Sequence, residues 1–240
     1  MNLMNHRKLH LLATTCLALL ALAIVAGCGG DGDGNGNGDN LIANPGFEDG
    51  ASGWQTRSDS LVVSEEQAAS GNASGLLEMR ATADSPTTLN FTAFQEFTVD
   101  KIPERMTAEY FVDNWVRGTE NQYIQVSVII TGSGPGMPEC PPGHPCPNIQ
   151  LRYILGGVTR EPVGVANAQF IFVGGEEPPL GEWTHFETDV LFDAAEYWGT
   201  LPSVIEKVRV QFEVRYDSRD LDEAPLEADV YLDDVYLGPR

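Results

Sequence analysis

Two stretches in the second half of the chain alternate apolar and polar side chains with a period of two. In residues 123–130 every second residue is Ile or Val, beginning at Ile124. Residues 208–215 repeat the pattern from Val208, with arginine, glutamine and glutamate between the apolar positions. Successive side chains of a β-strand point to opposite faces, so each stretch predicts a strand with one face in a core and one polar face.

Weaker strand patterns surround these two, with Gly, Pro, Asn and Asp clustered between them and no long segment of helical periodicity. About nine or ten strands of this kind predict an all-β fold, a two-sheet antiparallel β-sandwich of the jelly-roll type, occupying residues 41–240 as one domain. The weaker strands are expected at 76–82, 94–99, 106–116, 150–155, 168–173, 183–192 and 228–237.

The last expected strand contains a change of phase. Val230 and Leu232 share one face, whereas Val235 and Leu237 fall in the opposite phase. One extra residue must therefore be absorbed between the two pairs, which predicts a β-bulge at Asp233–Asp234.

The N-terminus has the features of a secretory signal, predicted to occupy residues 1–27. Arg7 and Lys8 precede an apolar run from residue 11 to residue 26, which is shorter than the ~20 residues that span a bilayer. The signal ends Val-Ala-Gly-Cys at residues 25–28, which resembles the bacterial lipobox and implies lipidation of Cys28. The alternative is ordinary cleavage that leaves Cys28 as an unpaired thiol.

A tether is expected at residues 28–40, because every residue from 29 to 40 is Gly, Asp or Asn. Gly29, instead of aspartate, follows the cysteine, which favours an outer-membrane or cell-surface position. The protein is thus expected to be extracytoplasmic and attached to the membrane by its N-terminal lipid. An alternative use of the tether is calcium binding, since Asp31 begins a half EF-hand pattern, but Ile42 stands where that loop needs glutamate.

The strongly negative net charge limits which partners the protein can bind. The full chain has 14 basic and 35 acidic residues and a formal charge of -21, and removal of residues 1–27 takes away two basic residues and no acids. A surface this acidic makes nucleic acid and anionic lipid head groups poor partners.

Both ends of the expected sandwich carry family motifs. Residues 40–48 read NLIANPGFE and are followed by Gly53-Trp54, and residues 230–237 read VYLDDVYL. These segments resemble the opening and closing motifs of carbohydrate-binding modules with the galactose-binding-like jelly roll, and residues 71–79, 95–99 and 181–184 resemble internal strands. Residues 131–180 depart from that pattern. The resemblance implies the fold and a binding function for carbohydrate.

Related jelly rolls often hold a structural calcium ion between the start of the domain and its last strand. Carried over by the resemblance, the acidic ligands are Glu48 and Asp234, and calcium is the expected cofactor. The alternative is a pair of solvated or hydrogen-bonded acids. In the same opening motif, Phe47 and Trp54 are expected in the core, and Pro45-Gly46 is expected to form a turn capped by the side chain of Asn44.

Sugar binding uses aromatic faces together with amides and guanidinium groups that bond hydroxyls. The polar sides of the two clear strands and one aromatic on a neighbouring strand supply such groups. Tyr197 or Trp198, in an expected loop at 193–200, is a further candidate platform, although each aromatic taken singly is more often a core residue. The predicted ligand-binding residues are Trp115, Tyr123, Gln125, Arg209, Gln211 and Arg215.

Two further cysteines, Cys140 and Cys146, bracket Pro-Pro-Gly-His-Pro and predict a small disulfide loop in an oxidising compartment. A metal site would need more ligands than these two cysteines and His144. No nucleophile motif accompanies His144 or His185, so catalysis is not expected, with a jelly-roll polysaccharide lyase as its remaining form. The rival function is a cell-envelope structural or protein-interaction module without a sugar site.

Overall fold

The computed structural model describes residues 39–240, except 58–59, 163 and 221–224. Within that part, eleven strands and one helix follow one another, and no helix is long and apolar enough to cross a bilayer. The predicted signal, Cys28 and nearly all of the tether lie outside the described residues. The elements are β1 (Gln55–Arg57), β2 (Leu61–Ser64), β3 (Ser74–Ala81), β4 (Leu89–Thr98), β5 (Arg105–Val116), β6 (Gln122–Ser133), β7 (Asn148–Gly156), β8 (Ala168–Phe172), β9 (Trp183–Asp189), α1 (Val190–Trp198), β10 (Val204–Tyr216) and β11 (Leu226–Gly238).

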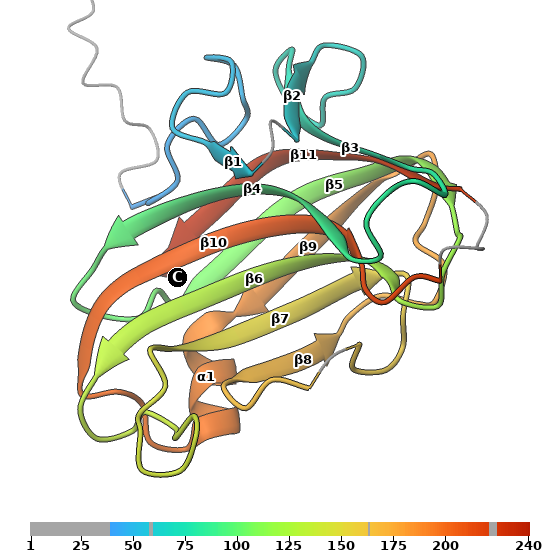
Figure 1. Ribbon diagram of the computed structural model, residues 1–240. Coiled ribbons are helices and arrows are strands. Elements are labelled where there is room, and N and C mark those ends of the chain that lie inside the picture. Colours follow the sequence, from blue (N-terminus) through green and yellow to red (C-terminus); the bar gives the residue numbers. More distant parts are fainter. Residues whose placement is uncertain (1–38, 58–59, 163, 221–224) are drawn as a thin grey trace, which may run out of the picture. The chain divides into compact units, whose positions relative to one another are not determined.

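The strands form two sheets, which confirms the predicted β-sandwich (Figure 1). One sheet has six strands in the order β1-β4-β10-β6-β7-β8, and the other has five in the order β2-β3-β11-β5-β9. The pairing is antiparallel except between β7 and β8, which run parallel, so the six-stranded sheet is mixed instead of wholly antiparallel as predicted.

The core lies between the sheets and is built from the alternating apolar residues of β6 and β10. Ile124, Val126, Val208 and Val210 are each 2% exposed or less. Because neighbouring residues on these strands point to opposite sides, burying this set directs the polar set to the outer side of the six-stranded sheet. The core therefore determines the register of the candidate site.

The opening motif packs into this core as expected. Phe47 is fully buried and stacks on Trp54 with ring centroids 4.9 Å apart. The side chain of Asn44 caps the turn between them by donating to Gly50 O at 2.8 Å and accepting from Asp49 N at 3.1 Å. A side chain at Gly75 would collide with the Phe47 ring, so that strand residue has to be glycine.

The predicted bulge in the last strand is present. The pairing of β11 with β5 shifts between Asp233 and Tyr236, and Asp234 has a positive φ of 47°. The same pair of strands shifts a second time, between Asp229 and Val230. Between the two sides of this second shift, β5 contains one more residue than β11, namely Asp113, which reverses the direction of the residues after it.

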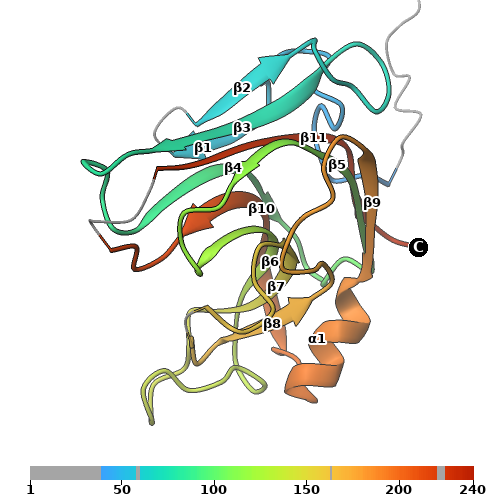
Figure 2. The same ribbon diagram turned by 90° about the vertical axis from the view of Figure 1, so that its right-hand side faces the viewer.

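The predicted strand at 183–192 is confirmed as far as Asp189, but a helix replaces its last three residues and most of the loop predicted at 193–200. The strand β9 ends at Asp189, whose carboxylate accepts from Phe192 N at 2.9 Å and caps α1. Gly199, with a φ of 65°, ends the helix. Aspartate before a helical turn and glycine after it are ordinary helix boundaries, and the nine-residue segment between them was too short to show a clear period. Figure 2 shows α1 below β9, at the side of the sandwich where β8 lies.

Candidate functional site

A polar surface lies on the outer side of the six-stranded sheet, across β10 and β6. Arg215 pairs with Tyr123 in the antiparallel register, and Glu213 pairs with Gln125. Five of the six predicted ligand-binding residues therefore come together, as the alternation indicated. We call this surface the polar face and define it by Tyr123, Gln125, Ser127, Arg209, Gln211, Glu213 and Arg215.

The centre of the polar face is the carboxylate of Glu213, which is only 3% exposed. It accepts from Gln211 Nε2 at 2.7 Å, from Asn90 Nδ2 at 3.2 Å and from the amide of Gln125. A buried carboxylate requires such donors, because an unpaired charge away from water is costly. The amides of two predicted binding residues are thus held in place by an acid that was not among the predicted site residues.

One end of the polar face is a buried chain of three side chains. Arg215 Nη2 donates to Asp217 Oδ1 at 2.7 Å, and the hydroxyl of Tyr123 donates to Asp217 Oδ2 at 2.8 Å. Burial, reinforced by Asp217, raises the pKa of Tyr123, so the hydroxyl keeps its proton. Burial opposes the charged form of Arg215, but the hydrogen bond to Asp217 and the charge attraction of Tyr123, Glu213 and Asp217 together outweigh it and raise the pKa of the guanidinium.

The other end of the polar face carries exposed charge. Glu96 on β4 accepts from Lys207 Nζ at 3.0 Å and from Arg209 Nη2 at 2.9 Å. These two hydrogen bonds hold the pKa of Glu96 below its usual range. The carboxylate therefore stays charged in mild acid and keeps both cations in place.

The polar face contains an unusual share of unsatisfied polar atoms. Five buried side-chain nitrogen or oxygen atoms of this one surface make no hydrogen bond within the described residues. They include donors as well as acceptors. Buried polar atoms are normally hydrogen-bonded, so atoms left open in one place indicate where water or a ligand binds. They are Gln125 Oε1, Ser127 Oγ, Arg209 Nε, Gln211 Oε1 and Arg215 Nε.

Trp115 does not join this surface, and the prediction that it lies beside the other five residues is wrong. It is on β5 of the opposite sheet, pairs with the buried Ala228 and packs against the core. The expected outward direction assumed unbroken alternation from Phe111, whereas the extra residue Asp113 turns Trp115 inward. Its ring is therefore not available as a platform on the polar face.

The two alternative aromatic platforms lie in α1. Trp198 packs against the core, and Tyr197 is 43% exposed. Neither residue is on a strand of the six-stranded sheet, so neither contributes to the polar face. The helix itself is held by Asp193, which accepts from Tyr153 OH at 2.8 Å and from Thr188 Oγ1 at 2.7 Å.

The predicted calcium ligands meet at one turn. Glu48 Oε1 accepts from the backbone N–H groups of Asn72 and Ala73 at 2.7 and 3.0 Å, which lowers the pKa of that carboxyl. The hydroxyl of Ser70 donates to Asp234 Oδ1 at 2.6 Å. One oxygen of each carboxylate is thus engaged by the protein and the other makes no hydrogen bond within the described residues.

Acidic side chains alone would not complete a calcium site. No group of three His, Cys, Asp or Glu residues in the described part of the chain is arranged to hold a metal. Calcium takes six to eight oxygen ligands, so backbone carbonyls and water would have to provide most of them beside Glu48 and Asp234. Calcium at this turn stays a prediction.

The neighbouring Asp233 is the buried acid of this segment. It is fully buried, and its Oδ2 accepts from the N–H groups of Ala69 and Ser70 at 2.8 and 3.0 Å. Burial is the larger influence and raises the pKa of Asp233 despite these bonds. The bulge directs this side chain to the turn, so Asp233 joins the last strand to the 69–73 segment without any metal.

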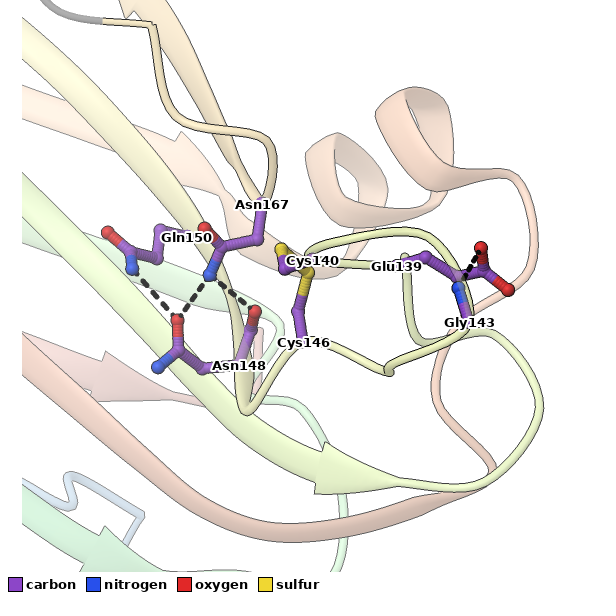
Figure 3. The surroundings of a disulfide bond; sticks show 7 residues. All are labelled: Glu139, Cys140, Gly143, Cys146, Asn148, Gln150 and Asn167. Carbon is purple, nitrogen blue, oxygen red and sulfur yellow. Dashed lines mark hydrogen bonds between the residues drawn. A yellow bond between two sulfur atoms is a disulfide. The ribbon is translucent and has the colours of Figure 1, made fainter.

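Cys140 and Cys146 form the predicted disulfide in the segment between β6 and β7 (Figure 3). The enclosed turn is also closed by backbone bonds, from Cys140 N to His144 O and from Cys146 N to Pro138 O, both at 2.7 Å. At the base of the loop, Asn167 Nδ2 donates to the backbone and side-chain oxygens of Asn148 (Figure 3). These two bonds hold Asn167, which precedes β8, against the first residue of β7, two residues after Cys146.

A hollow of about 540 Å³ lies away from the polar face. Its lining includes Leu41, Val99, Ile102 and Pro103, beside the first described residues and the C-terminal Pro239. None of the predicted binding residues lines it, and its largely apolar wall is bordered by Asp39, Asp100, Lys101 and Glu104.

The fold and the polar face together define a β-sandwich with a hydrogen-bonded polar surface on the outer side of one sheet. No family model and no curated protein matches the sequence. Similar solved structures include carbohydrate-binding modules: a family 61 module in complex with β-1,4-galactotriose (12% identity, 82% of this chain and 97% of that chain, TM-score 0.43) and a family 16 module (16%, 82% and 99%, 0.44). Another is the enzymatically active domain of tailspike protein 4 of bacteriophage CBA120 (10%, 83% and 21%, 0.45). All three TM-scores are below 0.5, so we base the functional proposal on this chain's own residues.

Proposed function

We propose that the protein is a non-catalytic module that binds carbohydrate through the polar face. The observation that carries this proposal is the set of five buried, unsatisfied polar atoms on one surface. Arg209 Nε and Arg215 Nε can donate, whereas Gln125 Oε1 and Gln211 Oε1 can accept. Sugar hydroxyls donate and accept, so a chain of them would satisfy both kinds of atom at once.

The carboxylates of the polar face and its surroundings are all hydrogen-bonded within the protein, which favours binding over catalysis. Glu96, Glu213 and Asp217 are each bonded to cations, amides or a phenol of the protein. A general acid or base has to reach the substrate, and these oxygens are already directed to protein donors. His144 lies in the disulfide loop, and His185 lies on β9 of the other sheet, where Nδ1 is 2.6 Å from Glu109.

The proposal includes attachment to the membrane through lipidated Cys28, which would display the sandwich outside the cytoplasm at the outer membrane or cell surface. It is supported by the signal and lipobox residues 1–28. Growth of producing bacteria with a labelled fatty acid tests it. Label should be present in the wild-type protein and absent from Cys28→Ser, whereas label retained by Cys28→Ser would refute this attachment.

The binding function is tested by a polysaccharide and glycan array probed with the full chain purified in detergent. Gln211→Ala removes one of the unsatisfied acceptors, and we expect it to lower the affinity about fivefold or more, as loss of a buried hydrogen bond does. Gln67→Ala, in the segment before β3, is the matched control and should bind as wild type. A folded protein that binds no carbohydrate would refute the proposal.

The rival function is a protein-interaction or structural module of the cell envelope, and one observation favours it. Tyr231, Phe111 and Trp183 form an aromatic row on the outer side of the five-stranded sheet, with neighbouring ring centroids 5.9 and 5.5 Å apart. Tyr231 and Phe111 are 3% and 7% exposed, so the half-buried Trp183 is the member of the row that a partner could contact. Crosslinking to an envelope protein that Trp183→Ala abolishes, together with a silent glycan array, would support the rival.

A further inference from the structure

Three arginines on the outer side of the six-stranded sheet each cover an aromatic ring of an adjacent strand. Arg209 lies 4.6 Å from the centroid of the Phe94 ring, and Arg152 on β7 lies 5.4 Å from that of Phe170 on β8. Arg215 lies 5.8 Å from the centroid of the Tyr123 ring. Stacking on a pyranose needs an open ring face, and here the guanidinium groups occupy those faces. The surface therefore presents cations where a stacking site would present bare rings.

Positive charge is concentrated on this surface although the chain as a whole is strongly acidic. The formal charge of the protein is -21, with only 14 basic residues. Five of them point to the outer side of this sheet, as the pairing register shows. A local concentration of cations on an acidic protein attracts an anion that the remaining surface repels. The five are Arg57, Arg152, Lys207, Arg209 and Arg215.

Part of this charge has no acidic partner within the described residues. Arg152 Nε and Nη2 donate to the neutral amide oxygen of Gln150 at 3.0 and 2.6 Å, and no carboxylate lies within ion-pair distance of this guanidinium. Arg209 and Arg215 are paired through their terminal nitrogens, yet the Nε of each is buried without an acceptor. The three guanidinium groups thus retain charge or N–H donors that no acidic partner in the described residues takes up.

We propose that the carbohydrate bound at the polar face carries carboxylate groups, that is, a uronate-containing polysaccharide. This inference rests on the proposed carbohydrate-binding function. Guanidinium groups bind planar carboxylates through two parallel N–H bonds, and stacking on a ring holds each guanidinium plane before the ligand arrives. The amide oxygens of Gln125 and Gln211 are then left for hydroxyl groups of the same sugar chain.

The test compares polymers that differ in charge and uses the full chain in detergent micelles. Isothermal titration is performed with polygalacturonate, with its fully methyl-esterified form, with a neutral galactan and with dextran sulfate. We expect polygalacturonate to bind about tenfold or more tightly than its ester, with an affinity that falls as salt rises. Equal affinity for the acid and the ester, or binding of the neutral galactan alone, would overturn this inference and leave carbohydrate binding intact. Equal binding of dextran sulfate would overturn the inferred preference for carboxylates, because it would show a general attraction of anions. No binding to any polymer would overturn both proposals.

Substitutions test which arginines contact the carboxylates of the polymer. Arg152→Gln should weaken polygalacturonate binding about tenfold and leave any binding of the ester unchanged. Arg209→Gln, which also loses a donor of the polar face, should weaken binding of both polymers, and that of polygalacturonate by more. Arg152→Lys keeps the charge but loses the planar fork, so it should fall between wild type and Arg152→Gln. Arg105→Gln, on β5 of the other sheet, is the matched control. Unchanged binding by both Arg→Gln variants, with the fold verified by circular dichroism, would overturn the assignment.

Discussion

The guanidinium of Arg209 on β10 lies 4.6 Å from the centroid of the Phe94 ring on β4, diagonally across the antiparallel register. Glu96, two residues along β4, accepts from Nη2 of the same guanidinium. The ring and the carboxylate thus restrain Arg209 from two sides. Its position is set by the protein before any ligand binds, which reduces the ordering cost of binding.

Phe94→Leu should weaken binding of a uronate polymer without unfolding the domain. The substitution keeps an apolar side chain on β4 but removes the ring under Arg209, so the guanidinium regains rotamer freedom. A cation–π contact of about 0.5–1 kcal/mol corresponds to a two- to fivefold loss of affinity. Titration with polygalacturonate measures the loss, and Phe192→Leu on the exposed face of α1 is the control. Unaltered affinity of Phe94→Leu would show that the ring does not position Arg209.

Glu96→Gln should strengthen binding of the same polymer. Glu96 competes for the donors of Lys207 and Arg209, and it repels an approaching carboxylate. Partly exposed ion pairs contribute about 0.2–1 kcal/mol, so removing this competitor should raise the affinity up to about fivefold. The gain should shrink in high salt, and Glu78→Gln on the five-stranded sheet should show none. Weaker binding by Glu96→Gln would contradict this expectation and show that the positioning of Arg209 by Glu96 outweighs its competition with the ligand.

The sequence pattern predicted most of the polar face because alternation on a strand depends only on neighbours in the chain. Arg209, Gln211 and Arg215 had to share a side once Val208 and Val210 were assigned to the core. The predicted direction of Trp115 was wrong for the complementary reason, because the extra residue Asp113 in β5 leaves no trace in the local alternation. The bulge in β11 was predictable only because buried residues on both sides of it disclosed the change of phase.

Long-range partners could not be predicted from the pattern. Asp217 and Asn90 belong to the site through contacts that depend on which strands are neighbours, and strand order was not deducible from the sequence. The helix α1 carried local signals, Asp189 before it and Gly199 after it, but a nine-residue segment directly after a strand reads as a continuation of that strand. The covering of Phe94 and Phe170 by arginine likewise appears only when β4 and β8 are placed beside their neighbours.

Asp233→Ala should destabilise the domain strongly. The buried carboxylate accepts from three backbone N–H groups, those of Ala69, Ser70 and Asp234. Removing it leaves these donors without a partner, which should lower the free energy of unfolding by about 3 kcal/mol. Asp234→Asn is the control, because asparagine also tolerates the positive φ of that position, and it should cost well under half as much. Equal effects in urea denaturation would contradict the separate roles given to the two acids.

Glu48→Gln should lower thermal stability at neutral pH and have no effect in strong acid. The N–H groups of Asn72 and Ala73 hold the folded-state pKa of Glu48 below its unfolded value. A depressed carboxyl pKa contributes stability that is present above the unfolded pKa and is lost as the pH falls through the folded pKa. The Tm values of the two proteins, measured in chelator, should therefore converge as the pH is lowered. Parallel Tm curves across that range would show that the charge of Glu48 contributes nothing.

Calcium should raise the Tm of the wild-type protein and not that of Glu48→Gln. One oxygen each of Glu48 and Asp234 makes no hydrogen bond within the described residues and remains for a cation at the turn joining the opening motif to β11. At a calcium concentration 100 times the Kd, binding adds about 2.7 kcal/mol, or roughly 5 to 10 °C in a domain of this size. Magnesium is the control, since its smaller octahedral shell suits such a carbonyl-rich turn poorly. If calcium and chelator give the same Tm, the two ends of the domain are joined by Asp233 and Glu48 through protein hydrogen bonds alone.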